Sequence, residues 1–544
     1  MRARWVGTVA VSMVAAAVVA GPPGSAPAPL FENLGTYHRA VTTSSARAQR
    51  YFDQGLVLFY AFNLAEAQRS FAEAARLDPG CASCWWGVGM SLGPHINLPA
   101  QADRTRAGHQ AALRALAVAD KATPIERDLV AALARRYSDP PPADAKGQRA
   151  LDEAYAAAMR EVARRFPQDD DVGALFAEAL MNLRPWDLWS HEGEPRPETP
   201  EVLAALEAVL ARSPRHPAAN HYYIHAVEAS AHPEKALAAA QRLGGLAPAA
   251  GHLVHMPAHI FMRMGRYEEA AEANRRAIVA EDAYIEKAKP EGFHWMYVAH
   301  NPQFLMAAAA MQGRSAEALA AARRAVGYLG PEMLRHMPGL DLGLAYPQWT
   351  LVRFGRWDEV LGEAAPPADF PFAVAMWHAA RALAFSAKGN AGEAERARGG
   401  MAAAAAAVPA DATEGLNPAS RLLAIASGLT GGELALRAGR GEDGVRQLQE
   451  AVRQEDALNY DEPSDWYYPA RHHLGAALLA LGRAADAQAV YEEDLRRSPE
   501  NGWALLGLAE SLRAAGRLPE AAAARVRFAK AWERADVALA ASRF

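Results

Sequence analysis

Histidines gather in one short stretch of the chain. Six of the 17 histidines fall between residues 221 and 259, where even spacing over 544 residues would place about one. His221 and His225 are four residues apart and Glu228 follows three residues later. On a helix, these three side chains would share one face within about 60° of arc. The spacing therefore predicts a helix that presents two imidazoles and a carboxylate in one direction.

A second group of the same kind follows. It comprises His252, His255, His259 and Met262, which would lie within about 80° of arc on another helix face. Imidazole pairs spaced by four residues direct two nitrogens at one ion without backbone strain. No cysteine is close in sequence and Glu228 is the obvious carboxylate. This nitrogen-rich set favours Zn or Cu, with Fe, Ni and Mn not excluded.

Three to five facing histidines would hold one ion with an open position, or two ions close together. An open position is what a metal needs to activate water or oxygen. Other catalytic patterns are missing from the sequence: H-E-x-x-H, a local Ser-His-Asp arrangement and a Gly-rich phosphate loop. The sequence thus indicates a metal site and identifies no catalytic residue.

Helices must position these side chains, and the composition favours them. Alanine supplies most of the apolar share and β-branched residues are sparse. Helix pairs recur with a period near 34 residues, most clearly in four stretches: Tyr51 to Pro79, His252 to Glu281, Trp466 to Pro499 and Asn501 to about Ala535. A chain of 544 residues is also too long for one core, so several domains or a repeat array are expected.

The repeat resembles the tetratricopeptide repeat (TPR) family. In the first unit the matching residues are Tyr51, Gly55, Ala67, Phe71, Ala74 and Pro79. The resemblance implies an all-α fold, a right-handed superhelical solenoid of helix-turn-helix units. It also implies a concave groove lined by the first helix of each unit, which would bind a peptide, a protein or a small molecule.

The family register places the two histidine groups in equivalent positions. Counted back from the turn at Gly265, His255 and His259 occupy the same places in their unit as His221 and His225 in the preceding one. The resemblance implies that these places face the groove. Neighbouring first helices should stand about 10 Å apart, which lets facing imidazoles share an ion.

The same register suggests further site residues. His300 starts the first helix of the next unit and is a candidate seventh member of the metal group. Other side chains are expected to line the groove or to lie over the site: Asn182, Trp186, Asp187, Tyr222, Met262, His294, Tyr297 and His472.

The expected organisation has five parts. They are a signal peptide at 1–20, an extension at 21–46, N-terminal repeats at 47–210 with an ordered Pro- and Trp-rich insert near 184–200, His-rich central repeats at 211–330, and C-terminal repeats at 331–544. A second break in the pattern, at 461–469, is also rich in aromatic residues. Both breaks are expected to pack onto or cap the groove.

The N-terminus predicts export. Arg2 and Arg4 precede an apolar run that ends in the small-residue step Val18-x-Ala20. An uncleaved anchor is the alternative, but the run is short for a membrane span and no later segment resembles one. We expect a periplasmic or secreted protein. The phrases at 51–56, 220–228, 251–260 and 461–469 also resemble a group of exported bacterial TPR proteins with an H-x-x-H-x-x-x-H helix. This second resemblance does not indicate which reaction the protein would catalyse.

Two cysteines, Cys81 and Cys84, form a C-x-x-C pair. A redox motif, half of a zinc site, a local disulfide and two inert thiols are all compatible with this spacing. In an oxidising compartment the last two are favoured.

Charge and composition leave three functional hypotheses. The net charge is -5 without a basic stripe, so nucleic acid is not expected as a partner. The first hypothesis is a solenoid with a transition-metal site, as a binding protein or a metalloenzyme. The second is a metal-free scaffold for peptides or proteins. The third is a structural assembly factor whose histidines only stack and hydrogen-bond.

Overall fold

The protein is described here from a computed structural model covering residues 28–290 and 292–544. The predicted signal peptide at 1–20 lies outside these residues. The chain divides into two compact units. The N-terminal unit holds residues 28–260 and 276–297, and the C-terminal unit holds residues 261–275 and 298–544.

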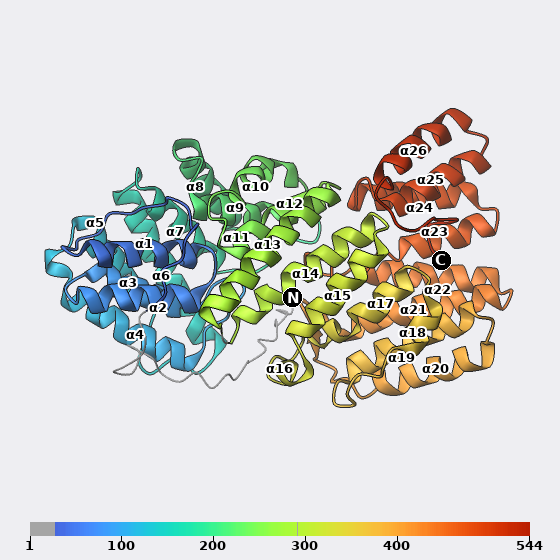
Figure 1. Cartoon of the computed structure of the whole chain (residues 1–544), viewed down its shortest axis with the longest axis horizontal. Coiled ribbons are helices and arrows are strands. Elements are labelled where there is room, and N and C mark those ends of the chain that lie inside the picture. Colours follow the sequence, from blue (N-terminus) through green and yellow to red (C-terminus); the bar gives the residue numbers. More distant parts are fainter. Residues whose placement is uncertain (1–27, 291) are drawn as a thin grey trace. The chain divides into compact units, whose positions relative to one another are not determined.

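The N-terminal unit is built from helices joined by short turns (Figure 1). Its helices are α1 (Ala46–Tyr60), α2 (Leu64–Leu77), α3 (Ala82–Leu92), α4 (Ala102–Ala117), η1 (Ala119–Lys121), α5 (Pro124–Leu133), α6 (Ala145–Arg165), α7 (Asp170–Met181), α8 (Thr199–Arg212), α9 (Pro217–Glu228), η2 (Pro233–Ala236), α10 (Leu237–Leu243) and α11 (Gly251–His255). Three helices contribute residues to both units: α12 (Pro257–Arg263), α13 (Tyr267–Ala288) and α14 (His294–Met311).

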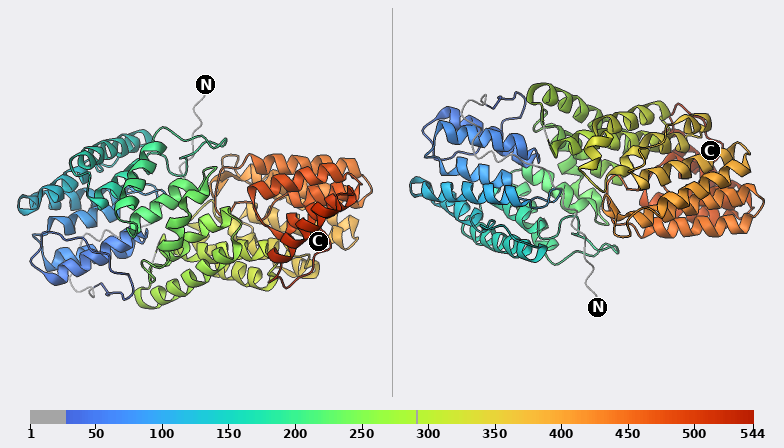
Figure 2. Two further views of the ribbon diagram at one scale, coloured as in Figure 1. Left: turned by 90° about the horizontal axis from the view of Figure 1, so that it is seen from above. Right: turned by 90° about the horizontal axis from the view of Figure 1, so that it is seen from below.

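The C-terminal unit continues the helix pairs, which Figure 2 shows from two further directions. Its elements are α15 (Ser315–Tyr328), α16 (Pro331–Arg335), η3 (Asp341–Ala345), α17 (Tyr346–Arg353), α18 (Trp357–Gly362), α19 (Pro371–Ala387), α20 (Ala391–Ala405), β1 (Thr413–Glu414), β2 (Asn417–Pro418), α21 (Ala419–Arg437), α22 (Gly441–Asp456), α23 (Arg471–Ala480), α24 (Ala484–Arg497), α25 (Gly502–Ala514) and α26 (Leu518–Ala531). Strands β1 and β2 form one two-residue hairpin. The predicted all-α fold of helix-turn-helix units is confirmed.

Small residues let neighbouring helices approach closely, as the repeat pattern predicted. Phe71 of α2 is fully buried between Gly55 of α1 and Gly87 of α3. A Cβ atom added to Gly87 would lie 2.4 Å from the Phe71 ring, and one added to Gly55 would lie 2.8 Å from it. Each helix pair therefore buries its apolar face against the next pair, which is how a repeat array builds a continuous core.

One predicted helix is divided. The spacing of His252, His255, His259 and Met262 predicted a single continuous helix, but α11 ends at His255 and α12 begins at Pro257. Proline has no backbone N–H and its ring clashes with the preceding turn, so it interrupts the ladder of hydrogen bonds. The histidines stay on neighbouring helical segments, and Met256 between these segments keeps helical backbone angles.

Both aromatic inserts are ordered. The Trp189 indole in the 184–200 insert donates to the Ala226 carbonyl oxygen of α9 at 2.8 Å. In the 461–469 insert, Trp466 is 2 % exposed and its ring centroid lies 5.1 Å from that of Trp349. Among the described residues, no helix combines the length and the apolarity that a membrane span requires.

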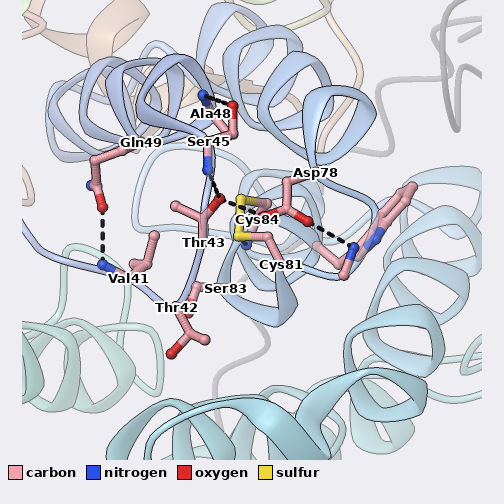
Figure 3. The surroundings of a disulfide bond; sticks show 12 residues. Val41, Thr42, Thr43, Ser45, Ala48, Gln49, Asp78, Cys81, Ser83 and Cys84 are labelled. Atoms are coloured by element: carbon pink, nitrogen blue, oxygen red, sulfur yellow. Dashed lines mark hydrogen bonds between the residues drawn. A yellow bond between two sulfur atoms is a disulfide. The ribbon is translucent and has the colours of Figure 1, made fainter.

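Cys81 and Cys84 form a disulfide at the start of α3 (Figure 3). Cys81 is also the N-cap of this helix, since its Sγ accepts a hydrogen bond from the Cys84 N–H at 3.1 Å. Both cysteines are fully buried. Of the alternatives open for this pair, the local disulfide is the one present.

The disulfide and the cap can be separated by mutation. We expect the Cys81→Ser/Cys84→Ser double variant to lose about 2 kcal/mol of unfolding free energy, the chain-entropy value for so short a loop. A serine at position 81 keeps an oxygen that caps α3. The Cys81→Ala/Cys84→Ala variant lacks this cap as well and should lose about 1 kcal/mol more. Denaturant midpoints measure the difference, and equal midpoints for the two variants would contradict the capping role.

Candidate metal centre

Helix α9 carries the first histidine group in a buried position. Pro217 opens the helix at N1, where a missing N–H costs nothing, and His216 caps it by accepting from the Ala219 N–H at 3.2 Å. Every residue of α9 is buried, including His221, which is fully inaccessible. A helix buried on all sides must satisfy its polar side chains internally.

Helices α9 and α11 bring three imidazoles together. The Nε2 atoms of His221 and His252 lie 3.1 Å apart. One ring nitrogen of His225 joins them, so that three potential ligand atoms lie within 4.8 Å of one another. Two nitrogens on one tetrahedral zinc ion stand about 3.3 Å apart, given Zn–N bonds of about 2.05 Å. The His221–His252 distance is thus close to that of two ligands on one ion, and His225 lies near enough to be a third ligand.

The tautomer of His221 is fixed by its other nitrogen. Its Nδ1 lies 2.6 Å from the backbone oxygen of Tyr60, an atom that can only accept. Nδ1 therefore carries the proton, and Nε2 of the neutral ring presents its lone pair toward His252. Hydrogen bonding from one imidazole nitrogen to a carbonyl is the usual support for a histidine that binds metal through the other.

Glu228 fixes two further rings. Its Oε1 lies 2.6 Å from Nδ1 of His225, and its Oε2 lies 2.5 Å from Nδ1 of His259. The carboxylate accepts from both, so each ring has its lone pair on Nε2. Nε2 of His225 is buried and has no hydrogen-bond partner. Glu228, predicted as a metal ligand, thus lies behind the imidazoles and orients them.

A second pair of ring nitrogens lies next to the first group. Nε2 of His255 and Nε2 of His259 are 2.9 Å apart. The ring centroid of His259 lies 5.6 Å from that of His225, and the centroid of His255 lies 5.8 Å from that of His252. The five predicted histidines of α9, α11 and α12 that belong to the N-terminal unit therefore form one cluster.

Burial keeps the imidazoles of His221, His225 and His252 neutral. It lowers the pKa of His221 and of His252 well below the ordinary value, with neighbouring imidazoles adding to the shift. Burial also lowers the pKa of His225, although Glu228 opposes the change. For Glu228, burial opposes ionisation, but His259 and His225 hold its pKa well below the usual range. Neutral imidazoles are the form that binds a metal.

Two neighbours of the cluster were not predicted. Phe62 follows α1 with a left-handed φ of 56°, and its ring centroid lies 4.5 Å from that of His221. His95 stacks on Phe62 at 4.4 Å, and its buried Nε2 has no hydrogen-bond partner. Both residues are more than 120 positions from α9 in sequence. No local spacing connects them to the histidine groups.

The ordered insert forms one wall beside the cluster. A small pocket, with about 20 Å³ of free volume, is lined by Ile96, Met181, Arg184, Trp186, Leu188, His225, Glu228 and Ala229. Trp186, predicted to lie over the site, stands edge-on to His225 with ring centroids 5.6 Å apart. Its indole N–H donates to Asn97 Oδ1 at 3.0 Å. The pocket gives a water molecule room next to His225.

The other predicted groove residues of this unit have varied positions. Tyr297 packs on His252 with centroids 4.5 Å apart, and its hydroxyl accepts from Asn97. Tyr222 is buried against Phe62. The remaining three bond elsewhere: Asn182 donates to Glu178, Asp187 pairs with Arg196, and His294 Nε2 lies 2.9 Å from Glu281.

Three predicted site residues belong to the C-terminal unit. Met262 is buried there. His300 is half-buried, and its Nδ1 lies 3.0 Å from Gln303 Oε1. His472 is fully buried between Arg353 and Asp494.

Comparison with known proteins adds the following findings. The family model described as tetratricopeptide repeat matches residues 464–524. Among solved structures, human IFIT1, as a dimer with m7Gppp-AAAA, is 12% identical over 90% of this chain and 91% of its own, with a TM-score of 0.32. The APC/C hetero-tetramer Cut9-Hcn1 is 13% identical over 90% of this chain and 74% of its own, with a TM-score of 0.30. None of the curated proteins matches the chain.

The matched segment coincides with α23, α24, α25 and the first turns of α26, which form consecutive helix pairs. The same helix-turn-helix motif recurs in the N-terminal and C-terminal units of the chain. Residues 464–524 are therefore a tetratricopeptide repeat, and the rest of the chain is built from helix pairs of the same kind.

Proposed function

We propose that the N-terminal unit binds a transition metal ion, Zn or Cu, through His221, His225 and His252. The observation that carries this proposal is the convergence of three buried imidazoles whose ring nitrogens lie within 4.8 Å of one another. Two of these rings have their Nδ1 atoms bonded to acceptors, which leaves Nε2 for an ion. Three imidazole ligands and no thiolate suit zinc and copper.

His255 and His259 offer a further pair of nitrogens close by. Glu228 connects this pair to the first group, since its carboxylate accepts from both His225 and His259. The cluster therefore has ligand atoms for an ion with an open coordination position or for a second ion. The pocket beside His225 supplies space for a water molecule at such a position.

A metal-free scaffold is the second candidate. The tetratricopeptide repeat at residues 464–524 favours it, because this fold suggests protein or ligand binding. Under this alternative the imidazoles only stack and hydrogen-bond, and chelators leave the protein unchanged.

Elemental analysis decides between the two candidates. The full chain, purified without chelators, should contain close to one equivalent of Zn or Cu, and His225→Ala/His252→Ala should lose it. His191→Ala is the matched control, since His191 is exposed on the 184–200 insert. Chelation should lower the melting temperature of the wild type but leave that of the double variant unchanged. Metal at background level in the wild type would end the proposal.

Glu228 should control metal affinity without being a ligand. Glu228→Gln keeps the size of the side chain. Its neutral amide has only one accepting oxygen, so it cannot accept from the N–H groups of both imidazoles. We expect the metal affinity to fall by about 10- to 100-fold, the usual effect of losing such a partner. Glu207→Gln on α8 is the control, because Glu207 accepts from Tyr223 at 2.8 Å on the same helix pair. Competition with a chromophoric chelator measures both, and unchanged affinity would show that Glu228 does not position the ligands.

We also propose that the protein is exported. Two features support this: the signal-like sequence at residues 1–20 and the Cys81–Cys84 disulfide, a bond that persists in oxidising compartments. When the full chain is expressed in a bacterium, the mature N-terminus found by mass spectrometry should be Gly21, in the periplasmic or secreted fraction. A cytosolic protein that retains residues 1–20 would contradict this expectation.

A further inference from the structure

A buried arginine in the C-terminal unit has no acidic partner. Arg353 is the last residue of α17 and is 4 % exposed. Among the residues that the structure describes, no carboxylate lies within ion-pair distance of it, and its one hydrogen bond is to His472. Burial lowers the pKa of Arg353 to about 9. A buried charge without a counter-charge is costly, so such a group is normally paired.

The one hydrogen bond leaves a specific pair of donors open. Nη1 of Arg353 donates to Nδ1 of His472 at 2.9 Å. Nε and Nη2 are both buried and have no hydrogen-bond partner. Their N–H groups lie along the same edge of the planar guanidinium. Together they form the fork that matches the two oxygens of a carboxylate.

His472 cannot supply the missing negative charge. Because its Nδ1 accepts from Arg353, its proton is on Nε2, which lies 2.9 Å from Asp494 Oδ2. Burial lowers the pKa of His472, consistent with a neutral ring. The nearest acidic group is thus one imidazole away from the guanidinium.

Aromatic rings fix the orientation of the Arg353 guanidinium. The guanidinium carbon of Arg353 lies 3.6 Å from the ring centroid of Trp503 and 4.8 Å from that of Tyr468. Trp503 is fully buried, and the Tyr468 hydroxyl is a further buried group without a hydrogen-bond partner. A fixed fork loses little conformational entropy when it binds a planar group.

We propose that Arg353 is the anchor of a carboxylate-binding site in which Nε and Nη2 each donate to one oxygen of the ligand. The ligand is an organic acid or the acidic group of a polypeptide, because both present the same planar anion. A water molecule would accept from the fork but would not neutralise it. The proposal concerns the C-terminal unit and does not depend on the metal centre.

The chain segment 536–544 covers this region. Ser542 Oγ donates to the backbone oxygen of His472 at 2.7 Å, and Arg543 pairs with Glu433 at 3.0 Å. Phe544 packs against Trp503 with centroids 5.8 Å apart and lies beside Gly355, two residues after Arg353. A ligand that reaches the fork from this side must move the segment.

Calorimetric titration of the full chain tests the proposal. Acetate and an amidated peptide with one central aspartate are the probes, with chloride at equal ionic strength as the reference. We expect one saturable site in the wild type and at least tenfold weaker binding in Arg353→Lys, which keeps the charge but lacks the fork. Arg356→Lys is the control, because Arg356 pairs with Glu359 at the surface. Acetate binding without peptide binding identifies a small acid, and tighter peptide binding identifies a polypeptide.

Two results would overturn it. One is saturable binding of equal strength in the wild type and Arg353→Lys, and the other is no saturable binding of either probe to the wild type. If Arg353→Lys fails to fold, the thermal unfolding midpoint of the wild type, measured with and without acetate, is the test instead. That midpoint should rise with acetate relative to chloride, and an unchanged midpoint rejects the site.

Discussion

The carboxylate of Glu228 is the interaction on which the histidine cluster depends. It accepts from Nδ1 of His225 on its own helix and from Nδ1 of His259 on α12. One ionised group thereby fixes the tautomer of two rings and joins two helices that a proline-divided segment would otherwise hold loosely. Without it, each neutral ring would be free to place its proton on either nitrogen.

A second buried carboxylate supports the other side of the cluster. Asp171 on α7 accepts from the Tyr60 hydroxyl at 2.5 Å and lies 3.3 Å from Nε2 of His216, the cap of α9. Tyr60 in turn offers its backbone oxygen to His221. Asp171 therefore positions the start of α9 and the end of α1 together. Buried polar networks of this kind hold one arrangement when every member has a partner.

Sequence reasoning could find the part of the site that follows from helical periodicity. The spacing of His221 and His225, and of His255 and His259, places each pair on one face, and the repeat register makes the pairs neighbours. The all-α fold and both ordered inserts followed from the same patterns. Pro257 is visible in the sequence, but the spacing of the histidines alone does not report that this proline divides the helix.

The remaining parts depend on contacts between distant residues. Phe62 reaches the cluster because α1 packs against α9, and His95 reaches it by stacking on Phe62; no local pattern reports such packing. The same limit applies to Glu228, whose oxygens are directed by the positions of two imidazoles and not by its own place on the helix. His472 shares the register of the groove but belongs to the C-terminal unit, where it lies between Arg353 and Asp494.

The two candidate sites follow from one rule about buried polar groups. In the N-terminal unit, Glu228 occupies Nδ1 of His225, so the lone pair on the buried Nε2 of this ring is left without a partner, and the proposed partner is a cation. In the C-terminal unit, His472 occupies only Nη1 of Arg353, so two N–H groups are left, and the missing partner is an anion. A buried group that is half satisfied is costly. Whether the unsatisfied atoms are acceptors or donors thus indicates whether each site would bind a cation or an anion.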